Sequence, residues 1–283
     1  MHDVFKSMKK SILLLLSIIV ISSCGEYQKM LRNPDSGLKY AMAEKMYNKG
    51  KYKKALKLME QVVPVYRGKP QAEKLMFMYS NTYYQLEDYY LSGYQFERFA
   101  SSYPKSEKLE EASFLSAKSY YQLSPVYSKE QKETKEAIEK LQEFINLFPG
   151  SKYTSEANTL VQELDFKLEK KAYEIAKQYN HISDYPASVR SFDNFIFEFP
   201  GSKLRENALF YRLDSAYKLA VNSVEYKNTP QNGLVHLKKE RLETAKEYSE
   251  AFKEIYANSE YIENVNEMAS AINEVLKSYS TKS

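Results

Sequence analysis

Residues that could do chemistry are few in this chain, and they lie far apart. The three histidines are His2, His181 and His236, and Cys24 is the only cysteine. Catalytic sites bring titratable groups together, and the sequence contains no glycine-rich phosphate loop, His-Glu-x-x-His or nucleophile-elbow pattern. Carboxylate pairs such as Glu110-Glu111 are typical of solvated helix faces. We therefore expect no catalytic activity, no cofactor and no metal site.

Cys24 is the residue with a clear chemical role. Three lysines precede about ten apolar residues that end at Ile21, and the small pair Ser22-Ser23 follows, as in a secretory leader. Ten helical residues span only about 15 Å, half a bilayer core. The run Ile21 to Cys24 resembles the lipobox of bacterial lipoproteins, which implies cleavage between Ser23 and Cys24 and acylation of Cys24. The alternative is an ordinary leader with an incidental cysteine.

Composition limits what the rest of the chain can be. Without residues 1–23, the formal charge falls from +4 to about +2, and this balance argues against a nucleic-acid or polybasic membrane surface. A body without cysteine has no disulfides, so burial must stabilise it. Only 8 Gly and 9 Pro accompany dense charges of both signs. That pattern favours long, solvent-facing helices.

A repeated octet divides the chain. Each copy ends an apolar pattern at helical spacing, and then Pro, Lys or Gly, and Ser end one helix and can cap the next. The three clear copies are 99–106, 144–151 and 195–202, and weaker ones lie at 62–66 and 252–259. A tetrad such as Tyr83-Tyr84-Gln85-Leu86 recurs at 120–123 and more loosely at 165–168 and 216–219. We expect each tetrad to end the helix that follows an octet.

The spacing of these motifs predicts where the repeats differ. Each octet aromatic precedes its tetrad Leu by 20 residues, whereas the next octet aromatic follows after 17, 25, 31 and then 37 residues. We therefore expect all insertions on one edge of the stack, although longer helix pairs would give the same arithmetic. Two aromatic columns follow and are predicted to form core between repeats, with a ligand-stacking surface as the alternative. They are Tyr66, Tyr103, Phe148, Phe199 and Tyr256, and Tyr47, Tyr84, Tyr121, Phe166 and Tyr217.

These patterns predict an all-α protein. Residues 43–59 resemble a tetratricopeptide repeat, with Ala43, Gly50 and Ala55 at the expected places. We predict a tetratricopeptide-like helical-repeat solenoid of about five helix pairs, with a C-terminal capping helix marked by Glu274 in an aromatic column. The predicted divisions are a lipoprotein signal peptide at 1–23, a lipid-anchored tether at 24–35 and the repeat domain at 36–283.

Such a solenoid offers binding through a groove lined by the first helix of each pair. Our candidates for a peptide groove in pairs two and three are Asn81, Tyr83, Lys118 and Tyr120. The alternative for each is packing or a solvent-facing position. The long insertions at about 124–132 and 220–240 are candidate partner surfaces.

A lipobox followed by five such repeats with the phrase aromatic-Pro-x-Ser resembles the BamD family of outer-membrane β-barrel assembly lipoproteins. The resemblance covers the mature chain and is strongest in the three clear octets. It implies a lipid anchor at the periplasmic face of the outer membrane. It also implies that the C-terminal repeats dock a BamA-like barrel-forming subunit and that the N-terminal repeats recognise unfolded outer-membrane proteins. The long insertions prevent transfer of a docking surface residue by residue.

Two other functions stay open. One is a different envelope repeat lipoprotein that coordinates peptidoglycan synthesis or binds glycans, although neither a coiled coil nor a much longer chain is present. The other is a peptidoglycan-cleaving enzyme, which would need a Glu in a deep cleft beside sugar-stacking aromatics. A short tether after Cys24 would hold the first repeats near the bilayer.

Overall fold

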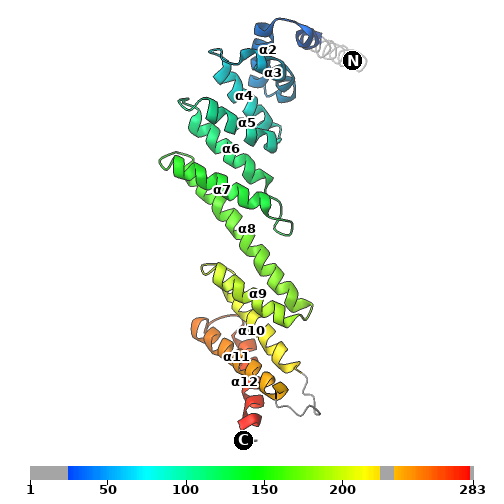
Figure 1. The fold of residues 1–283 in the computed structure, drawn as a ribbon, viewed down its shortest axis with the longest axis vertical. Helices are drawn as coiled ribbons and strands as arrows, with labels where there is room; N and C mark the ends of the chain where they lie inside the picture. Colours follow the sequence, from blue (N-terminus) through cyan, green and yellow to red (C-terminus); the bar gives the residue numbers. More distant parts are fainter. Residues whose placement is uncertain (1–24, 224–232, 281–283) are drawn as a thin grey trace, which may run out of the picture. The chain divides into compact units, whose positions relative to one another are not determined.

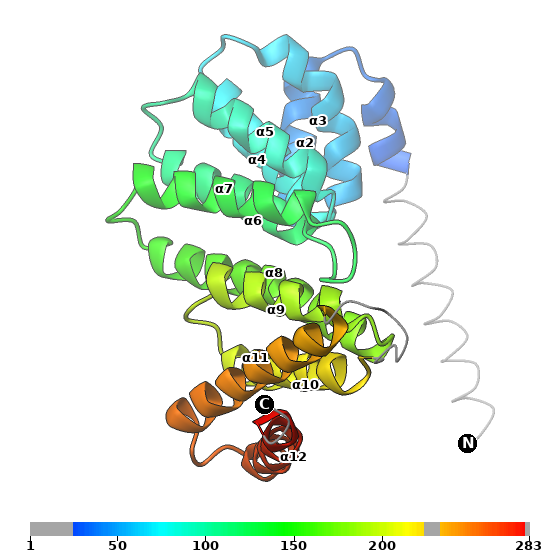
Figure 2. The same cartoon turned by 60° about the horizontal axis from the view of Figure 1, so that its bottom comes forward.

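A computed structural model describes residues 25–223 and 233–280, which form helices and connecting turns without a strand (Figure 1). After a helical stretch at residues 25–32, the helices are α2 (Ser36–Asn48), α3 (Tyr52–Tyr66), α4 (Ala72–Gln85), α5 (Tyr89–Ser102), α6 (Leu109–Leu123), α7 (Lys132–Leu147), α8 (Thr154–His181), α9 (Tyr185–Glu198), α10 (Arg205–Val221), α11 (Gly233–Ile255) and α12 (Ile262–Ser280). Consecutive helices pack in pairs (Figure 2). The predicted all-α, tetratricopeptide-like repeat fold is confirmed.

The chain forms two compact units. Among the described residues, the first comprises 25–125 together with 131–164, and the second comprises 126–130 with 165–223 and 233–280. Helix α8 belongs to both. Its first part packs Ala157, Leu160 and Leu164 into the core of α6 and α7, whereas its last part packs Tyr173 and Ala176 against α9 and α10.

The octets are helix ends, as the sequence predicts, and their aromatic pairs share one geometry. The backbone N–H of Tyr103 donates to the Phe99 carbonyl, and the N–H of Ser106 donates to the Tyr103 carbonyl. Phe99 is fully buried and its ring lies 5.2 Å from that of Tyr103. The pairs Phe144/Phe148, Phe195/Phe199 and Phe252/Tyr256 have centroid distances of 5.3–5.5 Å. The first aromatic of each pair is therefore the fully buried core residue. The second aromatic, which belongs to the predicted column, is only half-buried.

The second predicted column is wrong in the fourth pair. The sequence places Phe166 beside Tyr121 in the register, but Phe166 lies in the middle of α8 and is 42 % exposed. Helix α8 ends at Tyr179-Asn180-His181, followed by Ser183 with a positive φ of 64°. Glu87, after α4, has a φ of 62°. The true counterpart of the tetrad at 83–86 is therefore 179–182. The interval of 20 residues between octet aromatic and tetrad holds in the fourth pair only if the loose match at 165–168 is taken as the tetrad.

This correction reveals an internal duplication. Residues 77–123 correspond to residues 173–219 at a constant offset of 96. The N-cap carboxylate of Asp88 accepts from the N–H of Leu91, and that of Asp184 accepts from the N–H of Ala187. Buried serines join the helices in the same way, Ser119 to Ser92 at 2.9 Å and Ser215 to Ser188 at 2.8 Å.

The aromatic core of the duplication is also the same. Phe77 packs edge-on against Phe96 and Phe99, with centroids 5.7 and 5.5 Å away. Tyr173 packs in the same way against Phe192 and Phe195, at 5.9 and 6.0 Å. We name residues 77–123 the first block and residues 173–219 the second block.

The insertions do not all lie on one edge, contrary to the prediction. After Leu123 the extra residues form the α6–α7 connection, whose Lys129 carbonyl accepts from Lys171 at 2.6 Å on α8. After Leu168 the insertion lengthens α8 itself, which has 28 residues. In the fifth pair α11 is long, with 23 residues, and residues 224–232 lie outside the described part of the chain. The exposed Glu274 on α12 agrees with a polar outer face of the last helix.

The extended tether expected after Cys24 is also corrected. Residues 25–32 are helical, and Tyr27 is buried among Met46, Ala55 and Leu58 of the first pair. The Tyr27 hydroxyl donates to the Lys54 carbonyl at 3.1 Å. The apolar side chains of this helix make packing on the first pair more favourable than an extended chain, so residues 25–32 belong to the folded part.

Candidate functional site

The first helices of the pairs in the first unit form a hollowed face, as expected of a helical repeat. A hollow of about 540 Å³ lies over α2 and α4; we name it the α2–α4 groove. Its lining includes Tyr47, Lys74, Phe77 and Lys108. The remaining lining residues are Glu44, Asn48, Pro70, Glu73, Met78 and Phe99. The groove therefore combines an apolar floor with charges of both signs.

Polar pairs connect successive first helices along this face. Lys74 on α4 pairs with Glu44 on α2, and the amide of Asn81 on α4 donates to the hydroxyl of Tyr47 on α2. Farther along, Lys118 on α6 pairs with Glu156 on α8 at 2.6 Å. These bonds join neighbouring first helices along the face.

Two of the four predicted groove residues lie in this row. Asn81 reaches Tyr47, whose ring lines the α2–α4 groove. Burial opposes the charge on Lys118, but the hydrogen bond that Lys118 donates to Glu156 and the nearby charges outweigh it, so the Lys118 pKa is raised. The Lys118 ammonium also lies 5.6 Å from the centre of the Phe114 ring.

The other two predicted residues face into the helix packing. Tyr83 is only 6 % exposed, and its hydroxyl shares a 2.8 Å hydrogen bond with that of Tyr79 one turn earlier. Burial, followed by the bond to Tyr79, raises the pKa of Tyr83. Tyr83 is therefore a packing residue, which was the alternative to a groove position.

Tyr120 packs on α5 and not in the α2–α4 groove. A Cβ at Gly93 would lie 3.1 Å from its ring carbon Cε2, so the ring occupies the space that the glycine leaves. The Lys140 ammonium of α7 lies 5.4 Å from the ring centre. Burial and then the charge of Glu97 raise the pKa of Tyr120 to about 12. Tyr120 therefore joins three helices.

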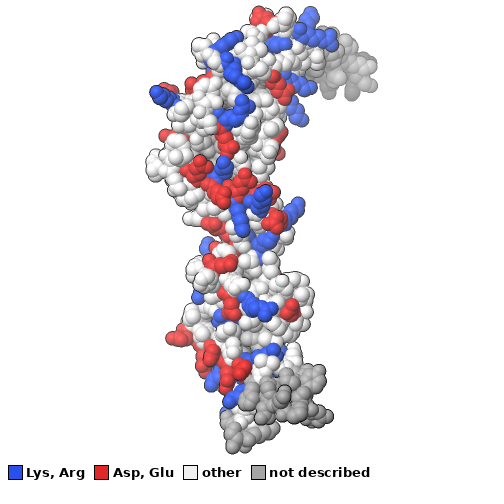
Figure 3. Space-filling model, viewed as in Figure 1, with Lys and Arg blue, Asp and Glu red and all other residues white. Residues whose placement is uncertain are grey.

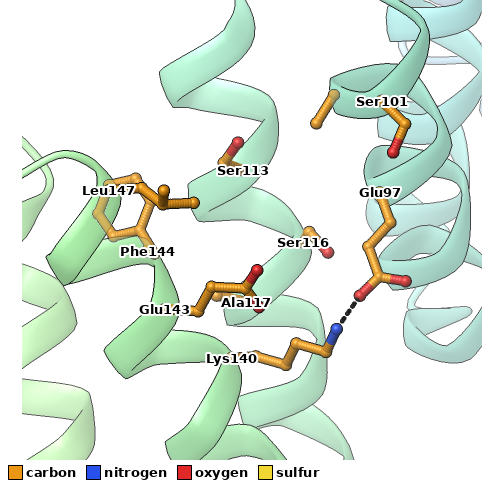
Figure 4. A pocket seen from close by; sticks show the side chains of 10 residues that line it. Glu97, Ser101, Ser113, Ser116, Ala117, Lys140, Glu143, Phe144 and Leu147 are labelled. Carbon is orange, nitrogen blue, oxygen red and sulfur yellow. Dashed lines mark ion pairs between the residues drawn. The ribbon is translucent and has the colours of Figure 1, made fainter. Parts of the chain in front are cut away.

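A second hollow, which the sequence did not predict, lies between α5, α6 and α7 (Figure 4). It has a volume of about 320 Å³ and we name it the α5–α7 hollow. An ion pair between Glu97 and Lys140, 2.5 Å long, crosses one side of it, and Leu147 is 64 % exposed at the other. Small side chains make the space: Ala100, Ser101, Ser113, Ser116 and Ala117.

The second block has larger side chains at the corresponding positions, although Phe197 among them is exposed. At the offset of 96 residues, the five small residues become Ile196, Phe197, Leu209, Arg212 and Leu213. The Arg212 guanidinium bonds to Asp193 at 2.9 Å and lies 3.8 Å from the centre of the Tyr248 ring. Alignment of the two blocks would have indicated the hollow from the sequence, because small residues in the first block stand opposite large ones in the second. The incorrect assignment of Phe166 to the aromatic column concealed this alignment.

The predicted lipidation site, Cys24, and the predicted cleavage partner Ser23 lie outside the described residues. Gly25, the next residue, lies in the helical stretch that Tyr27 anchors on α3. In the described ranges 25–223 and 233–280, no helix is both long and apolar enough to cross a membrane.

The helix pairs, their shared turn geometry and the groove over the first helices define a tetratricopeptide-like helical-repeat protein. Residues 33–231 match the YfiO family, described as outer membrane lipoprotein. This match covers more than half of the chain, so the protein belongs to that family of outer-membrane lipoproteins, the BamD type. No curated protein matches the chain.

Proposed function

We propose that the protein is a non-catalytic scaffold lipoprotein of the machinery that assembles β-barrel proteins in the outer membrane. In this proposal Cys24 carries the lipid, and the repeats lie at the periplasmic face. Membership of the outer-membrane lipoprotein family supports this role, and the chain offers no other thiol for acylation.

The α2–α4 groove is the proposed site for unfolded outer-membrane proteins. An extended segment carries unpaired backbone N–H and C=O groups, and it needs polar partners beside apolar contacts. The groove supplies the carboxylates of Glu44 and Glu73, the ammonium groups of Lys74 and Lys108, and the ring of Phe77. This mixture of polar and apolar groups in one hollow is the observation that carries the proposal.

The second unit is the proposed docking surface for the BamA-like barrel-forming subunit. Its counterpart of the first-helix face is held together by polar bonds, because Asn180 on α8 donates to both Asp214 and Ser215 on α10 at 2.8 Å. A pre-organised surface loses little conformational entropy when a folded partner binds. The groove suits an extended substrate, and the pre-organised face suits a folded domain.

Affinity capture of the tagged mature chain, followed by mass spectrometry, tests this function. We expect recovery of a barrel-forming subunit together with unassembled outer-membrane proteins. Disruption of the groove by the pair Lys74→Glu and Lys108→Glu should remove the unassembled proteins and keep the barrel-forming subunit. Consistent recovery of peptidoglycan synthases in place of both would contradict the proposal and favour the alternative envelope role.

The anchor has its own test. A Cys24→Ala variant should lose its lipid and leave the membrane fraction, as measured by mass spectrometry and fractionation of cells. Unchanged lipid and fractionation would contradict lipidation at Cys24.

A further inference from the structure

The positive charge of the mature chain is concentrated in its first helices. Residues 25–57 contain nine basic and three acidic residues, a net charge of +6, so residues 58–283 carry a net charge of −4. The near-neutral total, which argued against a basic membrane surface, is the sum of two opposite regions. Basic side chains are visible over the first helices in Figure 3.

Four exposed lysines form the centre of this region. Lys49 and Lys51 flank Gly50 in the α2–α3 turn, and Lys53 and Lys57 lie one turn apart on the outer face of α3. We name these four the lysine patch. Within residues 25–223 and 233–280, the ion pairs of the protein include none of its members.

The patch is costly for the helix that carries it. A helix N-terminus bears partial positive charge, so cations there are unfavourable. The equivalent helices α5 and α9 begin with the capping carboxylates of Asp88 and Asp184, whereas α3 begins with Lys51, which makes no side-chain cap, and has no acidic residue in its first turn. Local conflicts of this kind are expected where a function requires them.

The start of the folded chain lies beside the patch. Tyr27 bonds to the carbonyl of Lys54, whose ammonium lies 5.0 Å from the centre of the Tyr27 ring. Glu26 lies 3.9 Å from the ammonium of Lys45. Since Cys24 is only two residues before Glu26, a lipid on Cys24 would enter the bilayer next to α3, and no long tether separates them.

We propose that the lysine patch binds the anionic phospholipid headgroups of the bilayer that holds the lipid anchor. This inference rests on the anchor at Cys24 proposed above. Charge complementarity and the short covalent distance select a lipid surface as the partner. A lipid chain and a basic cluster are two membrane signals that reinforce each other, so the patch fixes the first helix pair against the membrane.

Vesicle binding by the mature chain, residues 24–283, with Cys24→Ser tests the patch without the lipid. Every described core residue lies within this chain, because the first of them is Tyr27. We expect binding to vesicles of phosphatidylcholine mixed with phosphatidylglycerol, weakened by salt, and little binding to phosphatidylcholine alone. Absence of binding to the anionic vesicles would overturn the proposal.

A quadruple variant supplies the direct comparison. Replacement of Lys49, Lys51, Lys53 and Lys57 by Gln should lower the vesicle partition coefficient by about 600-fold, because each of the four lysines contributes about fivefold near an anionic surface. A matched control replaces four exposed lysines elsewhere by Gln: Lys105, Lys132, Lys135 and Lys203. An equal loss in the control would mean that only total charge matters and would overturn the proposal.

Two further readouts separate the possible failures. The quadruple variant should unfold at the same or a higher urea concentration, because cations leave the N-terminus of α3. Normal vesicle binding by the variant, with loss of an acidic protein in affinity capture, would overturn the lipid assignment. Since the vesicle assay uses an unlipidated chain, a failure of the Cys24 anchor in cells would show in the fractionation test alone.

Discussion

The first block, 77–123, and the second block, 173–219, share one buried framework but have different surfaces. The capping aspartates, the buried serine pairs and the edge-on aromatic triads occur in both at the same offset. In the first block small residues leave the α5–α7 hollow, and in the second block larger side chains, Arg212 among them, stand at the corresponding positions. The buried framework therefore specifies the fold, and the positions between its members specify what each unit presents.

One pair of contacts shows how the blocks exchange volume. Gly93 gives its space to the ring of Tyr120 in the first block. The residues at the corresponding positions of the second block are Val189 and Ala216. The large and small partners have changed places, so the summed volume is similar while each contact is specific to its block.

The largest predicted effect concerns the part that the blocks share. Phe99→Ala and Phe195→Ala should each destabilise the protein by about 3–5 kcal/mol, because each removes a fully buried ring and leaves a cavity. Urea unfolding, with hydrogen exchange to locate the loss, measures both. Tyr103→Ala is the control at a half-buried ring and should cost less. Unequal losses at Phe99 and Phe195 would break the equivalence of the blocks.

The exchange of volume gives the next largest effect. Gly93→Val should destabilise the first unit by about 1–3 kcal/mol through overpacking against Tyr120. Adding Tyr120→Ala creates the pair found in the second block and should recover part of that loss. A double-mutant cycle from urea unfolding measures the coupling. Simple additivity of the two changes would contradict the exchange.

The ion pair beside the α5–α7 hollow and the pair of Arg212 in the second block should differ less in their effect on stability. Arg212→Ser should cost about 2 kcal/mol, because it removes a largely buried guanidinium from Asp193 and from the Tyr248 ring. Lys140→Ala should cost about 1 kcal/mol or less, since the Lys140 side chain is more exposed than that of Arg212. Thermal denaturation compares the two variants. A larger loss at Lys140 would show that the first block depends on its ion pair more than the second.

The smallest predicted effect appears at alkaline pH. The hydrogen bond to Glu163, followed by burial, raises the pKa of Tyr121 to about 12. Because this folded-state pKa lies above that of an unfolded tyrosine, its contribution is complete below about pH 10 and is lost as the pH rises toward 12. Unfolding midpoints of Tyr121→Phe should therefore change less over this range than those of the wild type. Tyr90→Phe, at an exposed tyrosine, should keep the wild-type dependence.

Much of the fold was predictable because it depends on local chemistry. The octets contain a helix end, a turn and a helix start within eight residues, so their sequence specifies their structure. The error at Phe166 has a physical cause. The loose match from Asp165 to Leu168 has the same apolar spacing as a helix end, but no turn residue follows it. Helix α8 therefore continues to His181, just before Ser183, whose φ is positive.

The candidate site was less predictable because it depends on which face each helix turns toward its neighbours. Asn81 and Lys118 lie in the row of polar pairs along the first helices, whereas Tyr83 and Tyr120, two positions later, face the packing. On a helix that difference turns a side chain by about 100° or more. The α5–α7 hollow was missed because a cavity made by absent side chain volume leaves no conspicuous residue in the sequence.

Photo-crosslinking in cells tests the central claim most directly. A photoreactive residue is placed at Lys74, in the α2–α4 groove, and in a matched variant at the exposed Lys135 on α7. If the groove receives unfolded outer-membrane proteins, position 74 should crosslink to unassembled barrel proteins while they are being synthesised, and position 135 should not. Equal crosslinking from both positions, or none from position 74, would contradict the account.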